Sequence, residues 1–217
     1  MSDETGRNIY VLHSKILIMI TETMSRKEIV DEILLDTKEL IQKTLHSTVF
    51  HSITKVFVRK RKTFNYPIIF KTSETIISKR NNNYLIIYAS DNIDNLGANH
   101  LCSYIKNNKK QYVLINFTEQ HCFFISEHFL SRFKERSEYL IDSDLPYFLL
   151  KEICIPEGNN IPDKNHLMFL KTLSGLAILS KIDNYCVYVT YMKNNLSYDK
   201  QQILNELNLS QIIAKEI

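Results

Sequence analysis

The chain has 217 residues, of which 44% are hydrophobic and 24% are charged, an ordinary globular composition. Its net charge of +3 is too small to identify the whole protein as a polyanion binder. Four glycines and four prolines exclude a collagen-like or linker-dominated chain, and the absence of a Cys-x-x-Cys pair argues against a zinc ribbon or a thioredoxin-type site.

An amphipathic helix is predicted to begin at Ser25 and to extend to about Thr54. Ser25 and Glu28 form a capping-box pattern. Residues 22–39 hold six acids and three bases, so we expect an acidic outer face. Apolar and β-branched residues recur at helical spacing at Val30, Ile33, Leu34, Thr37, Ile41, Leu45 and Thr48. The helix is expected to pack through Val30, Ile33, Leu34 and Ile41.

The middle of the chain is dominated by short apolar runs. They predict strands at 55–59, 66–70, 84–88, 111–117 and 121–125. The last two strands are expected to pair across a turn, and a short helix is predicted within residues 95–106. Residues 55–80 are strongly basic, with eight bases and one acid.

The last third of the chain returns to helical patterns. Ser126 is a predicted N-cap for a helix from Glu127 to Leu140, and a second short helix is predicted at 145–153. A strand pair is predicted at 176–180 and 186–190, and a final helix from Ser197. The fold class is therefore α+β: an N-terminal amphipathic helix, a mostly antiparallel sheet, a helix carrying His and two Arg, and a C-terminal helix.

The strongest local motif is the stripe of His128, Arg132 and Arg136, which recur at i, i+4 and i+8 on one side of the predicted helix. Both Arg132 and the helix dipole favour the neutral imidazole, which can transfer a proton near physiological pH. Guanidinium forks match phosphate oxygens. The alternative is a solvated basic helix face, with His128 as a surface or capping residue.

The order of elements over about residues 111–192 resembles metal-independent ribonuclease toxins of the barnase–EndoU–colicin–RelE superclass. The resemblance consists of the strand ending at Ser126, the His/Arg/Arg helix, a second short helix and a closing strand pair. It implies a curved sheet. It also divides the chain into an N-terminal helical and basic extension at 1–85, packed on a ribonuclease-like core at 86–217, unless the two form one continuous domain.

The resemblance also implies a mechanism in which RNA is cleaved through attack by its own 2′-OH. His128 would transfer the proton, and Arg132, with Arg136, would bind the scissile phosphate. Thr190 or Tyr191 would orient the phosphate in the same cleft. No metal or cofactor is expected in this mechanism. The acidic stretch at 141–163 differs from the pattern of these toxins and argues against a cleft that is open to a polyanion.

A second candidate for RNA contact is the run Arg59, Lys60, Arg61 and Lys62, which has aromatic residues on both sides. Such a run of cations indicates electrostatic contact with the phosphate backbone and no sequence specificity. The alternative is an edge strand or loop that its cations keep soluble.

Two classes of function remain open from the sequence. The first is an endoribonuclease of the toxin or defence-effector kind, with RNA as substrate and an antitoxin or another protein as partner. The second is a non-catalytic RNA- or protein-binding module of phage or mobile-element origin. A cytoplasmic protein is expected, because cysteine usage favours reduced thiols and the first apolar run, Ile9–Ile20, is too short to span a bilayer.

Overall fold

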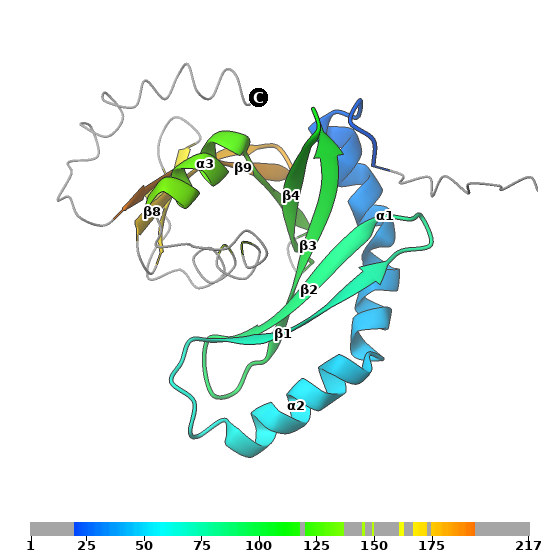
Figure 1. Ribbon diagram of the computed structural model, residues 1–217, viewed down its shortest axis with the longest axis vertical. Coiled ribbons are helices and arrows are strands. Elements are labelled where there is room, and N and C mark those ends of the chain that lie inside the picture. Colours follow the sequence, from blue (N-terminus) through cyan, green and yellow to red (C-terminus); the bar gives the residue numbers. More distant parts are fainter. Residues whose placement is uncertain are drawn as a thin grey trace, which may run out of the picture.

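The computed structural model describes residues 20–117, 120–136, 145, 149, 161–162, 167–172 and 175–193. These residues form three helices and one nine-stranded sheet, which confirms the α+β class (Figure 1). The helices are α1 (Arg26–Leu45), α2 (Thr48–Lys60) and α3 (Glu127–Arg136). The strands are β1 (Ile68–Ile77), β2 (Asn83–Ser90), β3 (Gly97–Lys106), β4 (Lys109–Asn116), β5 (His121–Ile125), β6 (Ile161–Pro162), β7 (Leu167–Lys171), β8 (Gly175–Ile182) and β9 (Tyr185–Lys193).

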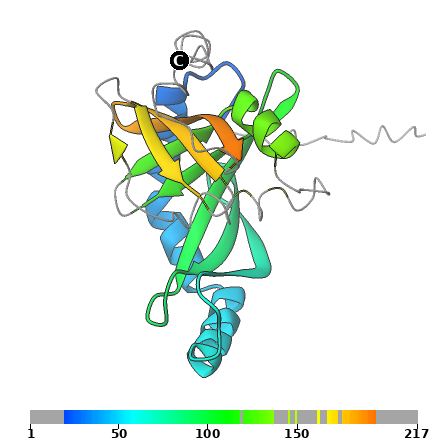
Figure 2. The same ribbon diagram turned by 90° about the vertical axis from the view of Figure 1, so that its left-hand side faces the viewer.

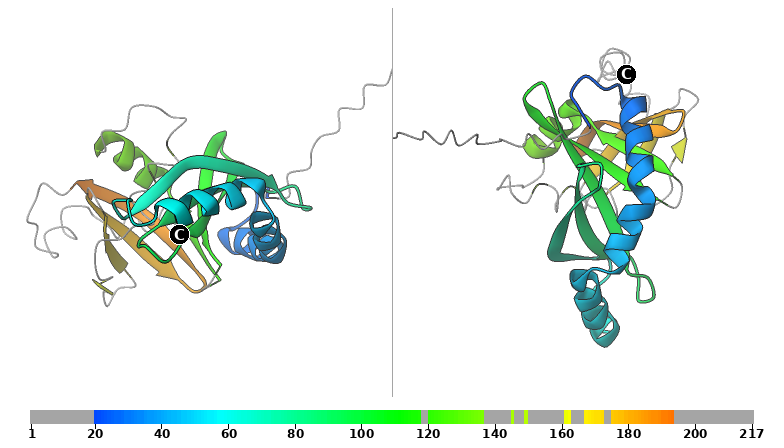
Figure 3. Two further views of the ribbon diagram at one scale, coloured as in Figure 1. Left: turned by 90° about the horizontal axis from the view of Figure 1, so that it is seen from below. Right: turned by 90° about the vertical axis from the view of Figure 1, so that its right-hand side faces the viewer.

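The sheet is curved and almost entirely antiparallel. Its strand order is β1-β2-β3-β4-β5-β9-β8-β7-β6, and only the β5–β9 pair is parallel. The two N-terminal helices follow one another along one side of the sheet, whereas α3 lies on the other side (Figure 3). The sheet is therefore covered on both faces, which explains why its central strands carry buried residues at consecutive positions.

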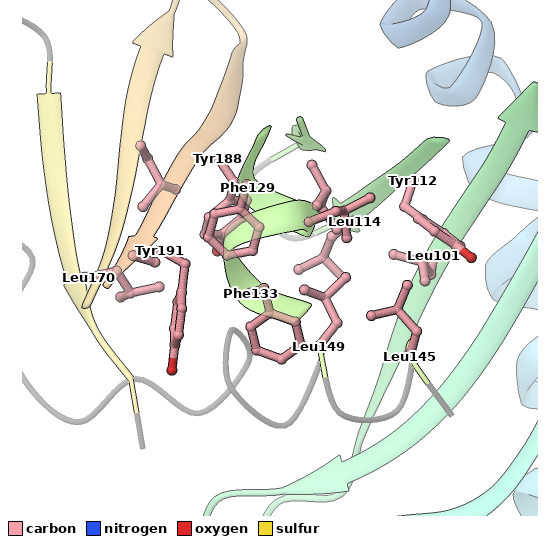
Figure 4. Close-up of a cluster of buried hydrophobic side chains, with 14 of the residues drawn as sticks. Leu101, Tyr112, Leu114, Phe129, Phe133, Leu145, Leu149, Leu170, Tyr188 and Tyr191 are labelled. Carbon is pink, nitrogen blue, oxygen red and sulfur yellow. The ribbon is translucent and has the colours of Figure 1, made fainter. Parts of the chain in front are cut away.

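Two apolar cores stabilise the fold, one on each face of the sheet. The core beneath α3 is rich in aromatic rings, including Phe129, Phe133, Tyr188 and Tyr191 (Figure 4). The core beneath α1 combines aliphatic residues of that helix, such as Ile29 and Ile33, with side chains of β2 to β5. Each element therefore contributes to a core that depends on residues far apart in the sequence.

The capping box at the start of α1 is confirmed. Ser25 Oγ accepts a hydrogen bond from the Glu28 N–H, and the Glu28 carboxylate accepts one from the Ser25 N–H. The helix ends at Leu45, however, and does not continue to Thr54. Ser47 caps a new helix, α2, because its hydroxyl oxygen accepts hydrogen bonds from the next free N–H groups.

Two predicted elements are wrong. Residues 55–59 form the second half of α2 and not a strand, since Ile53 and Phe57 are buried at helical spacing. Residues 97–106 form β3, paired on both sides, where a short helix was expected. The strands predicted at 84–88, 111–117 and 121–125 and the β8–β9 pair are confirmed. The end of the helix predicted to run to Leu140, most of the helix predicted at 145–153 and the final helix from Ser197 lie outside the described residues.

The charge pattern predicts acids on the outer face of α1, but two of the acids of this helix lie on its inner face. Glu32 and Asp36 are buried against the β1–β2 hairpin, whereas Ile41 is 39% exposed. Arg80 donates two hydrogen bonds to the Glu32 carboxylate, at 2.5 and 2.7 Å. Tyr84 OH donates to Asp36 Oδ2 at 2.7 Å. These bonds hold α1 on the hairpin and offset part of the desolvation of the two carboxylates, since Asp36 Oδ1 is buried without a hydrogen-bond partner among the described residues.

A single acid holds the joint between α1 and α2. The Glu74 carboxylate accepts hydrogen bonds from Ser47 Oγ at 2.6 Å and from the hydroxyl of Tyr88. Ser47 is the residue that caps α2, so the same hydroxyl starts the helix and ties it to β1. The direction in which α2 leaves the body of the protein therefore depends on Glu74.

The imidazole of His100 makes the fold sensitive to acid. It is buried beneath α1, where it forms a hydrogen bond of 2.9 Å with Thr44 Oγ1. Burial lowers the pKa of His100 from 6.5 to about 4. Below pH 6.5 the unfolded chain therefore binds a proton that the folded protein excludes, so stability falls as the pH falls toward 4.

We expect the free energy of unfolding to fall by about 2 kcal/mol between about pH 7 and about pH 5 because of His100. Urea unfolding across this range measures the change. In His100→Gln the decrease should largely disappear, whereas in the control His51→Gln, at an exposed position, it should persist. An unchanged pH dependence in His100→Gln would contradict the prediction.

Gly175, the first residue of β8, lies against the ring of Tyr191. A β-carbon there would lie 2.1 Å from Met192 O and 2.7 Å from Tyr191 Cζ. Gly175→Ala should lower the free energy of unfolding by about 1–3 kcal/mol, because the strand or the ring must move. Thermal unfolding measures the loss. Gly97→Ala is the matched control, since its nearest contact would be Ala89 O at 3.7 Å; equal losses in both variants would refute this explanation.

Candidate functional site

Helix α3 covers the edge of β9 that β5 leaves open. β5 ends at Ile125, opposite Tyr188, whereas β9 continues to Lys193. The Ser126 N–H donates to Tyr188 O at 3.2 Å, and Ser126 Oγ lies 3.3 Å from Val189 O, to which it donates. Ser126 Oγ also accepts from the Phe129 N–H, which confirms the predicted cap. The cap thus fixes both the start of α3 and its place beside β9.

Arg136 is used by the fold. Its Nη1 donates a hydrogen bond of 2.7 Å to Tyr191 O, on the same open edge of β9. One of the two predicted phosphate-binding guanidiniums therefore holds the C-terminal end of α3 in place. Its partner in the predicted stripe, Arg132, is 39% exposed and forms an ion pair of 2.9 Å with Glu135. His128, in the first turn of α3, is partly buried.

A bulge decides which side of β9 faces α3. Ile178 pairs with Thr190 and Leu179 with Tyr188, so Val189 is an extra residue in β9. Because of it, Tyr188 and Tyr191 lie on the same face, where both rings pack against α3 (Figure 4). Thr190 then lies on the opposite face.

Both strand residues of the predicted site are fully buried. Thr190 and Tyr191 are each 0% exposed, and Thr190 Oγ1 has no hydrogen-bond partner among the described residues. The prediction that Thr190 lines an open cleft with His128 and Arg132 is therefore wrong. Tyr191 does lie beside α3, but its ring is part of the apolar core. Sequence alternation alone does not reveal such a bulge.

The second predicted surface lies at the far end of the molecule's long axis (Figures 1 and 2). We call residues 48–72, which form α2, the following turn and the first half of β1, the α2 arm. It contains no acid and six cations, all exposed: Lys55, Arg59, Lys60, Arg61, Lys62 and Lys71. None of them forms an ion pair with another described residue. The α2 arm therefore presents uncompensated positive charge.

Aromatic rings support the basic run from below. Phe57 is buried, and its ring lies 6.4 Å from that of Phe64 and 6.5 Å from that of Tyr66. Phe70 lies edge-on to Phe64 at 5.8 Å. The Tyr66 hydroxyl donates to Arg61 O, so the turn that carries the cations is held by the same cluster. The basic run at the end of α2 is thus held in place by a cluster of packed aromatic side chains.

A smaller basic surface lies between the β3–β4 hairpin and α3. A groove of about 500 Å³ there is lined by Lys109, Lys110 and Lys134. Lys109 forms an ion pair with Glu127, and Lys110 lies over the ring of Tyr112. The charge of this groove is therefore partly compensated, in contrast to the α2 arm.

The cysteine thiols of the described residues are buried in the core and are not positioned for chemistry. Burial raises the pKa of Cys122 to about 12, so its thiol stays protonated. Cys102 is fully buried as well. Among the described residues, no three His, Cys, Asp or Glu side chains gather as metal ligands. No helix in this part of the chain is long and apolar enough to cross a membrane.

Comparison with known proteins adds no assignment: the sequence matches no family model, and neither a curated protein nor a solved structure matches it.

Proposed function

We propose that the protein binds single-stranded RNA through the α2 arm. The observation that carries the proposal is the set of six exposed cations with no acid among residues 48–72. The nearest acid in sequence on the C-terminal side, Glu74, accepts hydrogen bonds from Ser47 and Tyr88 and is directed into the fold. An anionic chain can therefore contact the cations without displacing an internal partner, and the gain comes from counterion release.

Single strands fit this surface better than a duplex would. The cations occupy the end of one helix and the turn after it, next to partly exposed aromatic rings such as Phe64 and Tyr66. Flexible strands can follow such a short, curved path, and unpaired bases can contact rings as well as phosphate-binding cations. Binding of this kind depends strongly on salt and weakly on sequence.

Removal of two arm cations should weaken binding of a labelled oligouridylate. For Arg59→Ala with Lys60→Ala we expect at least about tenfold lower affinity at low salt. The slope of log affinity against log salt should fall by about 1.4, the value for two lost phosphate contacts on a single strand. Fluorescence anisotropy over a salt series measures both quantities.

The matched control is Lys27→Ala with Lys38→Ala, which removes the same charge from exposed positions of α1. It should change affinity and slope much less than the arm variant. Equal effects of the two double variants would indicate a general charge effect and contradict binding at the α2 arm.

A second candidate function is metal-independent cleavage of the bound RNA by residues of α3. The observation that favours it is the helix itself, which carries His128 and Arg132 four residues apart with the Arg132 side chain exposed. In this proposal the His128 imidazole takes the proton of the attacking 2′-OH and gives it to the leaving 5′-oxygen, and Arg132 exchanges its ion pair with Glu135 for one with the phosphate. Arg136, bound to Tyr191 O, positions the helix.

If the protein cleaves RNA, activity should persist in chelator and His128→Ala should lower the rate by about 10²-fold or more. His46→Ala, at an exposed position between α1 and α2, is the control and should retain the wild-type rate. Gel analysis of a labelled RNA measures the rate. Binding without cleavage by the wild-type protein would exclude this candidate and leave the RNA-binding function in place.

A further inference from the structure

A groove of about 360 Å³ lies between α2 and β1. Its walls are formed on the helix by Val49, Ser52 and Val56 and on the strand by Phe70 and Thr72. β1 is the edge strand of the sheet, with β2 as a neighbour on one side only. The groove therefore opens at the margin of the sheet and on the surface of the α2 arm.

An irregularity in β1 shapes the strand wall of this groove. Ile69 pairs with Ala89 and Ser73 with Ile87, so three residues of β1 lie opposite a single residue of β2. Phe70 and Thr72 are two of these three residues. The bulge lets β1 bend locally and places both side chains in the groove wall.

The walls combine apolar surface with hydroxyl groups. Val49, Val56 and Phe70 supply carbon surface, and Phe70 is partly buried. The hydroxyls of Ser52 and Thr72 are exposed and form no hydrogen bond with another described residue. Because a hydroxyl can both donate and accept, such walls suit a flat ring that carries donors and acceptors on its edge.

The groove leads directly to the basic run. The wall residues Val49, Ser52 and Val56 recur at helical spacing, and the next positions on that side of α2 are Arg59 and Lys60. Both are exposed at the end of the helix. A ligand with a flat ring in the groove and a negative group one unit further along would match this order of side chains.

We propose that the groove between α2 and β1 receives one unpaired base of single-stranded RNA while Arg59 and Lys60 contact the adjacent phosphates. This inference rests on the proposed RNA binding and assigns a subsite to it. The charge favours RNA over an apolar peptide segment, because the α2 arm carries six cations and no acid. The base contributes stacking and edge contacts, and the phosphates contribute the salt-dependent part of the affinity.

Two probes separate the base subsite from the phosphate contacts. One is an oligouridylate about 12 nucleotides long, and the other has the same backbone length but is built from stable abasic units. Ser52→Leu fills the groove with a good helix former and leaves the charge unchanged. We expect it to lower affinity for the oligouridylate by about tenfold or more. It should leave both the salt slope and the affinity for the abasic probe at wild-type values.

Val58→Leu is the matched control, since it places the same side chain at an exposed position of α2 that does not line the groove. Circular dichroism checks that α2 is retained. Thr72→Leu blocks the groove from the strand side and should reproduce the effect if Ser52→Leu fails to fold.

The outcomes distinguish this inference from the function on which it rests. Wild-type affinity for the oligouridylate in the groove variants, together with loss in Arg59→Ala/Lys60→Ala, would overturn the base subsite alone. Equal losses on the abasic and base-containing probes would also overturn it. A wild-type protein that binds neither probe would overturn RNA binding itself.

Discussion

Three carboxylates hold the helical half of the protein on the sheet, and the rest of the arrangement depends on them. Glu32 and Asp36 bind α1 to the β1–β2 hairpin, and Glu74 binds the start of α2 to β1. Glu32 and Asp36 are buried, and a buried carboxylate is costly unless its oxygens are hydrogen-bonded, so both acids require their partners. The requirement leaves few ways to place α1 and α2, because Glu74, Arg80 and Tyr84 all belong to the β1–β2 hairpin, whose register is set by strand pairing.

The same constraint accounts for the charge of the α2 arm. Glu74 is the single acid among residues 55–80, and it is committed to Ser47 and Tyr88 inside the fold. The six cations of the α2 arm therefore form no ion pair with another described residue, and their mutual repulsion has to be offset by other interactions. The ring cluster of Phe57, Phe64, Tyr66 and Phe70 beneath the run supplies apolar contact for this purpose. A surface held in this way is suited to a ligand that brings the negative charge.

The environment of α3 shows how structural demands limit a candidate catalytic site. An exposed stretch of strand edge needs a cover, and α3 provides it with the Ser126 cap at one end and the Arg136 guanidinium at the other. Arg136 thereby serves the fold, and the bulge at Val189 places Thr190 on the far face of the sheet. Of the other two residues of the stripe, His128 has a buried Nε2 atom and Arg132 is paired with Glu135, whereas the α2 arm keeps all of its cations exposed.

Local patterns were sufficient for the features that depend on neighbours in the chain. The Ser25 capping box, the Ser126 cap, the strands at 84–88 and 111–117 and the exposed basic run all follow from residues within a few positions of one another. Features that depend on distant partners did not follow. Residues 55–59, for example, have a β-branched pattern that fits either a strand or a helix. They are helical in the structure because Ile53 and Phe57 are buried on one side of α2. The burial of Glu32 and Asp36, the bulge in β9 and the groove beside β1 were decided only by tertiary structure, because each needs a partner on another part of the fold that folding alone brings close.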